Sequence, residues 1–105
     1  MLKVYGSSMC PDCRNCKLNF DKFGIEYEYI DINASIRNLK DFLILRDKEE
    51  CFVRLKAVHD VGIPALVDEE KVFTDWETYL KEQGYTDLEY EKSEGHACSI
   101  DGKGC

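Results

Sequence analysis

The sequence predicts an α/β domain with a four-stranded mixed sheet and helices on both faces of that sheet. A strand–helix–strand pattern over residues 1–32 requires two parallel strands, because a helical crossover joins them. Two short apolar runs around a polar turn, within residues 65–73, predict a hairpin. Apolar residues at helical spacing before and after that hairpin supply further helices to cover the sheet.

The first strand–helix–strand unit follows from local patterns. Residues 2–5 are an apolar run typical of a strand, and a Gly-Ser-Ser turn follows it. Pro11 suits the first position of a helix. The apolar stripe of that helix consists of Cys13, Cys16, Phe20 and Phe23. Gly24 ends the helix, and residues 25–32 alternate between polar and β-favouring residues, which predicts the second strand.

The second half begins with helical spacing. Ser35 is a candidate N-cap, and residues 35–59 predict one broken helix or two consecutive helices with a restart at Asp47, three residues before Glu50. Residues 65–67 and 72–73 form the hairpin strands.

The last predicted helix starts with Thr74, followed three residues later by Glu77 in a capping-box pattern, and ends at Gly84. Its residues Trp76, Tyr79 and Leu80 have the spacing of a core-facing stripe.

Length and charge exclude several classes of function. The chain has 105 residues, which suits one domain, and 14 Lys and Arg against 21 Asp and Glu give a net charge of −7. Such a charge disfavours nucleic acid and anionic membrane surfaces. The N-terminus lacks the apolar region of a secretory signal, and no stretch approaches the ~20 apolar residues of a membrane span. We therefore expect a cytoplasmic monomer.

Six cysteines in a reducing compartment require a chemical explanation, because structural disulfides are rare there. Cys10 and Cys13 form a C-x-x-C pair where a strand passes into a helix, within a βαβ pattern. The helix N-terminus favours negative charge and so lowers the pKa of a thiol there. We predict that Cys10 is the exposed attacking thiolate and that Cys13, deeper by one turn, resolves the mixed disulfide.

An alternative use of the cysteines is metal binding or thiol sensing. Cys16 extends the pair to C-x-x-C-x-x-C, although its place on the apolar stripe favours a core role. Cys51 beside Phe52 is also expected to pack. In the tail, Cys98 and Cys105 could exchange with Cys10, or His96 and Cys98 could join Cys10 and Cys13 around zinc.

The segment from Tyr5 to Cys13, Y-G-S-S-M-C-P-D-C, resembles the active-site segment of glutaredoxins, members of the thioredoxin-like superfamily. The element order is similar to the glutaredoxin type of that fold. The resemblance covers residues 1–84, expected to form the glutaredoxin-like domain, and is nearest to bacterial glutaredoxin-related proteins with a long middle segment. Residues 85–105 are expected to be a partly flexible C-terminal extension, with a loose tail from Ser93 onward.

The resemblance implies a function and a set of site residues. It implies a thiol–disulfide oxidoreductase that reduces protein disulfides or glutathione mixed disulfides and contributes to cell redox homeostasis and electron transport. No bound cofactor is expected, and glutathione, as co-substrate, or thioredoxin reductase would supply electrons. Ile63-Pro64 matches the family's cis-proline, and Thr74-Asp75 matches the helix start that holds a glutathione carboxylate. The expected substrate- or glutathione-binding residues are Pro11, Asp12, Ile63, Pro64, Thr74 and Asp75.

Several positions depart from the glutaredoxin pattern. Ser7 stands where many glutaredoxins have Lys, and Val72-Phe73 replaces a glycine pair. No basic residue occupies the expected position beside the proline, where residues 59–62 intervene. These differences favour thioredoxin reductase as the electron donor. Asp12 replaces an aromatic residue, and its negative charge predicts a less acidic Cys10 thiol than the family norm.

Overall fold

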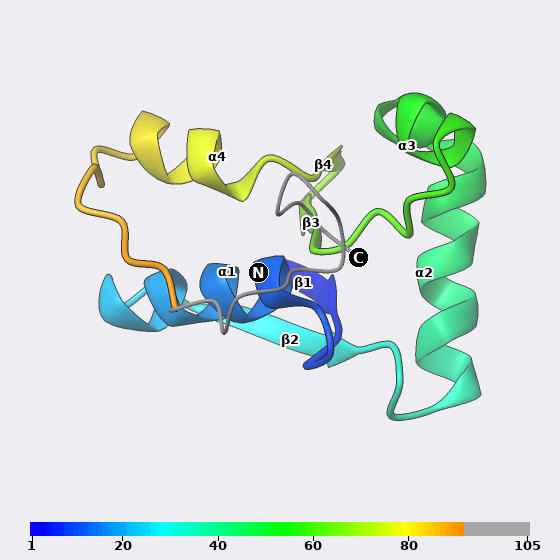
Figure 1. Ribbon diagram of the computed structural model, residues 1–105, viewed down its shortest axis with the longest axis horizontal. Helices are drawn as coiled ribbons and strands as arrows, with labels where there is room; N and C mark the ends of the chain where they lie inside the picture. Colours follow the sequence, from blue (N-terminus) through cyan, green and yellow to red (C-terminus); the bar gives the residue numbers. More distant parts are fainter. Residues whose placement is uncertain (92–105) are drawn as a thin grey trace.

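The computed structural model describes residues 1–91 and has the α/β, thioredoxin-like fold of the glutaredoxin type that the sequence predicts (Figure 1). The elements in chain order are β1 (Leu2–Gly6), α1 (Pro11–Lys22), β2 (Tyr27–Asp31), α2 (Ile36–Lys48), the 3₁₀ turn η1 (Glu50–Phe52), α3 (Val53–Ala57), β3 (Ala65–Asp68), β4 (Lys71–Phe73) and α4 (Trp76–Glu82). None of these helices is long and apolar enough to cross a membrane.

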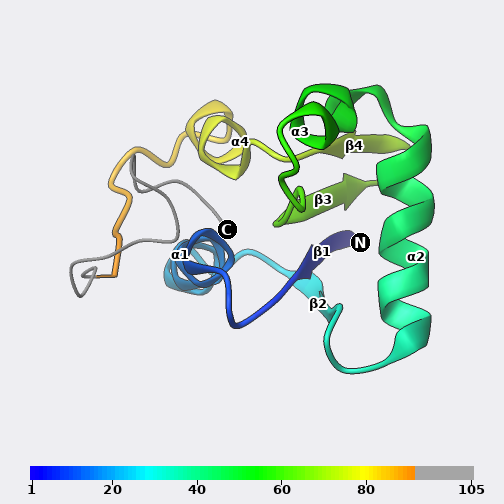
Figure 2. The same ribbon diagram turned by 45° about the vertical axis from the view of Figure 1, so that its right-hand side comes forward.

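The sheet has the strand order β2-β1-β3-β4. β1 and β2 are parallel, whereas β3 is antiparallel to both β1 and β4, so the predicted hairpin is confirmed (Figure 2). β1 therefore lies inside the sheet between two partners. The loop that follows Gly6 consequently leaves the sheet near its middle, next to the start of β3 at Ala65.

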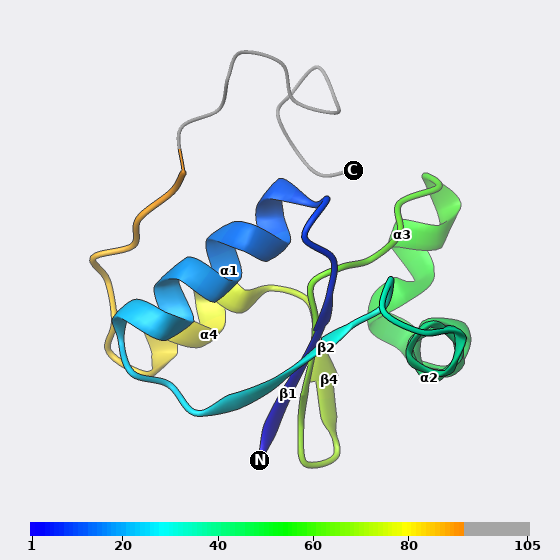
Figure 3. The ribbon, with the colours of Figure 1, turned by 90° about the horizontal axis from the view of Figure 1, so that it is seen from below.

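Helices cover both faces of the sheet: α1 and α4 lie on one side, and α2 and α3 lie on the other (Figure 3). The buried residues under α1 and α4 are Leu2, Val4, Cys16, Phe20, Leu66, Trp76 and Leu80. The buried residues on the α2 side are Tyr5, Ile32, Phe42, Phe52 and Ala65. Alternate residues of β1 enter the two clusters, because successive side chains of a strand point to opposite faces.

Two predicted helix starts have different outcomes. Ser35 is the N-cap of α2, and its hydroxyl accepts a 3.1 Å hydrogen bond from the Asn38 amide, as expected. The capping box from Thr74 is wrong, because the N-cap of α4 is Asp75, whose carboxylate accepts from the Thr78 amide at 3.1 Å. Asp is the stronger capping residue of the two neighbours.

The segment between α2 and β3 corrects two further expectations. The helix does break, but α2 continues past Asp47 to Lys48 and the chain restarts through a 3₁₀ turn at Glu50. Cys51 is exposed, so the packing role predicted for it is wrong, whereas Phe52 is fully buried. The 3₁₀ turn has three residues per turn, and it changes which side chains face the core.

Residues 85–91 pack against α1 and run antiparallel to it toward the start of that helix (Figure 3). Tyr85 stacks on Phe23 with ring centroids 4.6 Å apart. The buried amide of Asn19 donates to the Glu89 carbonyl at 2.7 Å and accepts from the Glu89 amide at 2.7 Å. The tail predicted from Ser93 onward, with His96, Cys98 and Cys105, lies outside the described residues.

Candidate active site

The C-x-x-C pair lies at the junction of β1 and α1. The amide of Cys10 donates to the Ser7 carbonyl at 3.1 Å, which closes the turn after β1. Cys10 is the N-cap of α1 with extended backbone angles, and Pro11 takes the first helical position, as the sequence predicts. The sulfur of Cys10 therefore lies at a helix N-terminus, where free amides favour the thiolate.

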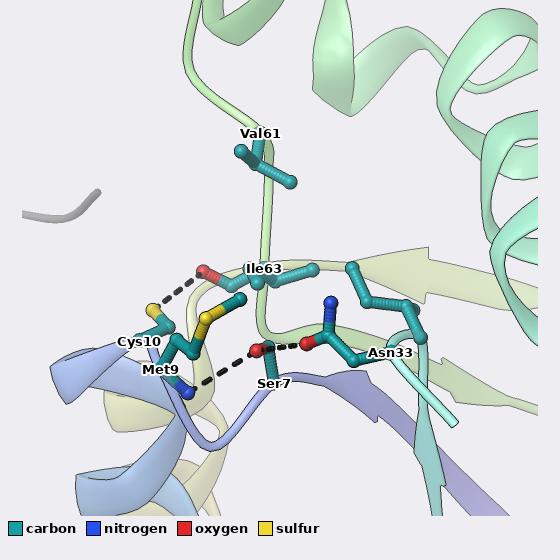
Figure 4. Close-up of a pocket in the computed structure, with 7 residues that line it drawn as sticks. Ser7, Met9, Cys10, Asn33, Val61 and Ile63 are labelled. Carbon is teal, nitrogen blue, oxygen red and sulfur yellow. Dashed lines mark hydrogen bonds between the residues drawn. The ribbon is translucent and has the colours of Figure 1, made fainter. Parts of the chain in front are cut away.

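Cys10 is less accessible than expected. Its side chain is only 3% exposed, so the prediction of an exposed nucleophile is wrong, although Cys13 is still deeper at 0%. The backbone before Pro64 lies over Cys10, whose Sγ is 3.9 Å from the Ile63 carbonyl oxygen (Figure 4). The Ile63–Pro64 bond is cis, as expected from the family resemblance.

The two thiols differ strongly in acidity. A hydrogen bond from the Cys13 thiol lowers the pKa of Cys10 to about 7, against the opposing effect of burial, and the Cys13 and Asp12 backbone amides add to the lowering. This value is close to that of the active cysteine in thioredoxin, ~7. The same hydrogen bond raises the pKa of Cys13, and burial and the charge of Cys10 raise it further. Cys10 is therefore the more acidic of the two thiols, and Cys13 stays protonated at neutral pH.

Asp12 turns its side chain toward α4. Burial raises the pKa of Asp12, a hydrogen bond from Trp76 lowers it, and the charges of Glu77, Asp60 and Asp75 raise it again. The Trp76 indole donates to Oδ1 of Asp12 at 3.1 Å. The charge of Asp12 raises the pKa of Cys10, as the sequence predicts, but this effect is smaller than the hydrogen bonds that lower it.

A pocket of about 210 Å³ opens beside Cys10 (Figure 4). Its other lining residues are Ser7, Met9, Ile32, Asn33, Val61 and Ile63. The Ser7 hydroxyl donates to the side-chain oxygen of Asn33. The remaining walls are apolar. Sequence reasoning missed Met9, Ile32, Asn33 and Val61, because they come from three separate segments and share no spacing.

Thr74 and Asp75 lie at the start of α4 and do not line this pocket. Asp75, rather than Thr74, caps the helix, because its carboxylate accepts hydrogen bonds from the amide and the hydroxyl of Thr78. Its pKa is lowered by those hydrogen bonds, so it is a carboxylate at neutral pH. The start of α4 is linked to the C-x-x-C segment by the neighbouring Trp76, whose indole donates a hydrogen bond to Asp12. A role of Thr74 and Asp75 in holding glutathione stays a prediction.

Gly6 and Tyr29 lie behind Cys13. A Cβ atom at Gly6 would lie 2.8 Å from Tyr29 Oη and 3.1 Å from Cys13 Sγ. Burial raises the pKa of Tyr29, so its hydroxyl stays neutral beside the thiol. The glycine is needed because it leaves room for both groups. A glycine at the end of a strand is the one signal that the sequence offers for this contact.

Cys16 is fully buried in the core under α1, as its place on the apolar stripe predicts. Burial raises the pKa of its thiol, which makes it a poor nucleophile. Within residues 1–91, no group of three or more His, Cys, Asp or Glu side chains is arranged to hold a metal ion. The zinc alternative that includes His96 and Cys98 lies outside the described residues.

Comparison with known proteins matches the part of the chain that contains the C-x-x-C pair. The glutaredoxin family model matches residues 2–46, which include β1, α1 and both active-site cysteines. An uncharacterized protein of Haemophilus influenzae is 36% identical over 64 residues, which is 61% of this chain and 74% of that protein. The chain belongs to the glutaredoxin family. No solved structure matches the chain significantly.

Membership of the glutaredoxin family places the chain among thiol–disulfide oxidoreductase-like proteins. The matched range ends at residue 46, before the cis-proline and the start of α4. The family model therefore covers the two thiols of the C-x-x-C pair. It does not cover the opposite wall of the pocket, which contains Val61 and Ile63 and is described by the structure alone.

Proposed function

We propose that the protein is a thiol–disulfide oxidoreductase that reduces disulfides with Cys10 as nucleophile and Cys13 as resolving thiol. The observation that carries this proposal is the division of acidity between the two cysteines. A pKa of about 7 makes roughly half of Cys10 a thiolate at neutral pH. Cys13 remains a thiol whose hydrogen bond stabilises that thiolate.

The reaction proceeds in two exchanges. The Cys10 thiolate attacks one sulfur of the substrate disulfide, forms a mixed disulfide and releases the other substrate sulfur as a thiolate. Cys13 then loses its proton and attacks Cys10, which forms the Cys10–Cys13 disulfide and releases the second substrate thiol. The hydrogen bond from Cys13 is lost when Cys10 becomes bonded to the substrate. Two electrons pass from the dithiol to the substrate.

The cycle needs a reductant that restores the Cys10–Cys13 dithiol. Glutathione and thioredoxin reductase are the two donors to compare. The pocket beside Cys10 contains no basic side chain, and Ser7 is bonded to Asn33. This arrangement favours a reductase over glutathione, because no cationic side chain lines the pocket to pair with a glutathione carboxylate.

The test measures disulfide reduction by wild type, Cys10→Ser and Cys13→Ser, with each electron donor in turn. Cys10→Ser should lower turnover by at least about a thousandfold. Cys13→Ser should accumulate a mixed disulfide with a protein substrate, visible as added mass on Cys10. The exposed Cys51→Ser is the matched control and should turn over like wild type. Normal turnover by Cys10→Ser would contradict the proposal.

A further inference from the structure

The pocket beside Cys10 has the properties of a substrate subsite. Met9, which is 72% exposed, and Val61, which is 39% exposed, stand at its rim as apolar side chains in contact with solvent. Large apolar groups at the mouth of a cavity are typical of binding surfaces. The cavity of about 210 Å³ is below the ~300–1,000 Å³ of pockets that enclose a whole small-molecule ligand. Its size suits one side chain.

The position of the pocket determines what enters it. Cys10 is 3% exposed and forms part of the pocket wall, so a disulfide that reaches Cys10 brings its neighbouring groups against the same wall (Figure 4). The Ser7 hydroxyl is already paired with the Asn33 oxygen. An acidic side chain would find no cation among the lining residues, whereas an aliphatic one would be removed from water.

Several carboxylates gather near Asp12, the residue two positions after Cys10. Trp76 bonds to Asp12, and this contact brings the first turn of α4, with Asp75 and Glu77, next to the active-site turn. Asp60 comes from the segment just before Val61, and its charge also acts on Asp12. Arg14 is paired with Glu91, whereas Arg46 keeps its positive charge while it donates to the carbonyls of residues 60 and 61.

We propose that the pocket binds an apolar side chain adjacent to the disulfide cysteine of a protein substrate, and that the carboxylates around it select substrates with basic flanking residues. This inference rests on the proposed function, because it names the substrate class of the same thiols. The glutathione moiety of a mixed disulfide has two carboxylates and no apolar side chain, so it fits neither the pocket nor the surrounding charge. Electrostatic complementarity of this kind acts mainly on the rate of encounter.

The test uses short peptides with an internal disulfide that differ at one position each. One pair has Leu or Gly beside the cysteine, and another has Lys or Glu as flanking residues. A glutathione mixed disulfide is the anionic comparison. The chain has one tryptophan, Trp76, whose indole is hydrogen-bonded to Asp12 in the C-x-x-C segment. Its fluorescence in a rapid-mixing experiment should therefore report oxidation of the dithiol. The peptides contain no tryptophan.

We expect the Leu peptide to react about tenfold faster than the Gly peptide. At low ionic strength the Lys peptide should react about tenfold faster than the Glu peptide, and salt should reduce that ratio. Val61→Ser should lower the Leu preference, whereas Val53→Ser, at an exposed valine of α3, should not. Glu77→Gln should lower the charge preference, whereas Glu70→Gln, in the β3–β4 turn, should not.

The outcomes separate this inference from the proposed function. Equal rates for all peptides, or fastest reaction with the glutathione mixed disulfide, would overturn the substrate class while leaving the dithiol chemistry intact. Failure of every disulfide to oxidise the wild-type protein, or oxidation of Cys10→Ser at the wild-type rate, would instead contradict the proposed function.

Discussion

The two helical faces of the sheet are held together differently. On the α1–α4 face, fully buried side chains of both helices meet, and residues 85–91 add hydrogen bonds to the Asn15 and Asn19 side chains. On the α2–α3 face, Phe42 and Phe52 form the core. Several large apolar residues of that face remain exposed: Ile36, Leu43, Ile44, Val53 and Val58. The face that carries the C-x-x-C pair is the more completely packed one, which would suit the proposed site, because such a site must hold its geometry.

The largest expected difference between the faces is the loss in free energy of unfolding when a leucine of α4 or of α2 is replaced. Leu80 is fully buried under α4, whereas Leu43 is 37% exposed on α2. Leu80→Ala should lower the free energy of unfolding by about 2–5 kcal/mol, because it opens a cavity in the core. Leu43→Ala should cost less than about 1 kcal/mol. Urea denaturation of both variants measures this, and equal losses would contradict the comparison.

A smaller effect is expected from two asparagines. The Asn19 side chain makes hydrogen bonds with both the amide and the carbonyl of Glu89. The half-buried side chain of Asn38 donates one hydrogen bond to the Asp31 carbonyl. Asn19→Ala should cost about 2–3 kcal/mol, because it leaves backbone groups unpaired, and Asn38→Ala about 1 kcal/mol. Hydrogen exchange of the Glu89 and Glu91 amides should accelerate only in Asn19→Ala. Unchanged exchange there would mean that residues 85–91 do not depend on Asn19.

A steric prediction concerns the space behind the resolving thiol. Gly6→Ala places a methyl group 2.8 Å from Tyr29 Oη and 3.1 Å from Cys13 Sγ, so it should cost about 1–3 kcal/mol and slow the resolution step. Tyr29→Phe in the same chain removes the nearest atom and should restore part of the loss. Stability and the lifetime of the mixed disulfide are the measurements. No rescue by Tyr29→Phe would show that the contact is not responsible.

The smallest effects should come from two surface ion pairs between residues four positions apart, one on each face. Lys17–Asp21 lies on α1 at 3.2 Å, and Arg37–Asp41 lies on α2 at 3.3 Å. Both are exposed, so Asp21→Asn and Asp41→Asn should each change stability by about 0.5 kcal/mol or less, with less effect at high salt. A large loss in either variant would show an interaction beyond the ion pair.

Local patterns predicted much of this molecule. The structure confirms the apolar stripe through Cys16 and Phe20 and the N-cap at Ser35. It also confirms the cis bond before Pro64 that the family resemblance implied. The wrong predictions involve neighbours in competition. Asp75 rather than Thr74 is the N-cap of α4, so the helix starts one residue later than predicted. Phe52 rather than Cys51 is buried, because the 3₁₀ turn changes which side chains face the core.

The features that could not be predicted are long-range contacts. Met9, Ile32 and Val61 come together only because the sheet places the ends of β1 and β2 next to the segment before β3. The contact of Asn19 with Glu89 joins residues 70 positions apart. The burial of Cys10 depends on the backbone at Ile63. Periodicity describes one segment at a time and carries no information about such pairings.

The central claim is that Cys10 is the activated thiol, and a thiol on each face allows a direct test. Cys51 on the α2–α3 face is exposed, but burial of part of its surface and the charge of Glu49 raise its pKa. Cys10 is nearly buried, but its pKa is about 7. Because only the thiolate reacts, alkylation of Cys10 should increase as the pH rises through about 7, while Cys51 should require a higher pH.

The measurement is the rate of iodoacetamide alkylation of the reduced protein as a function of pH, with the modified cysteine identified by mass spectrometry. We predict that Cys10 is modified first at neutral pH, that its rate has an apparent pKa near 7, and that Cys13 stays unmodified. Faster modification of Cys51 than of Cys10 at neutral pH, or equal modification of Cys10 and Cys13, would contradict the account.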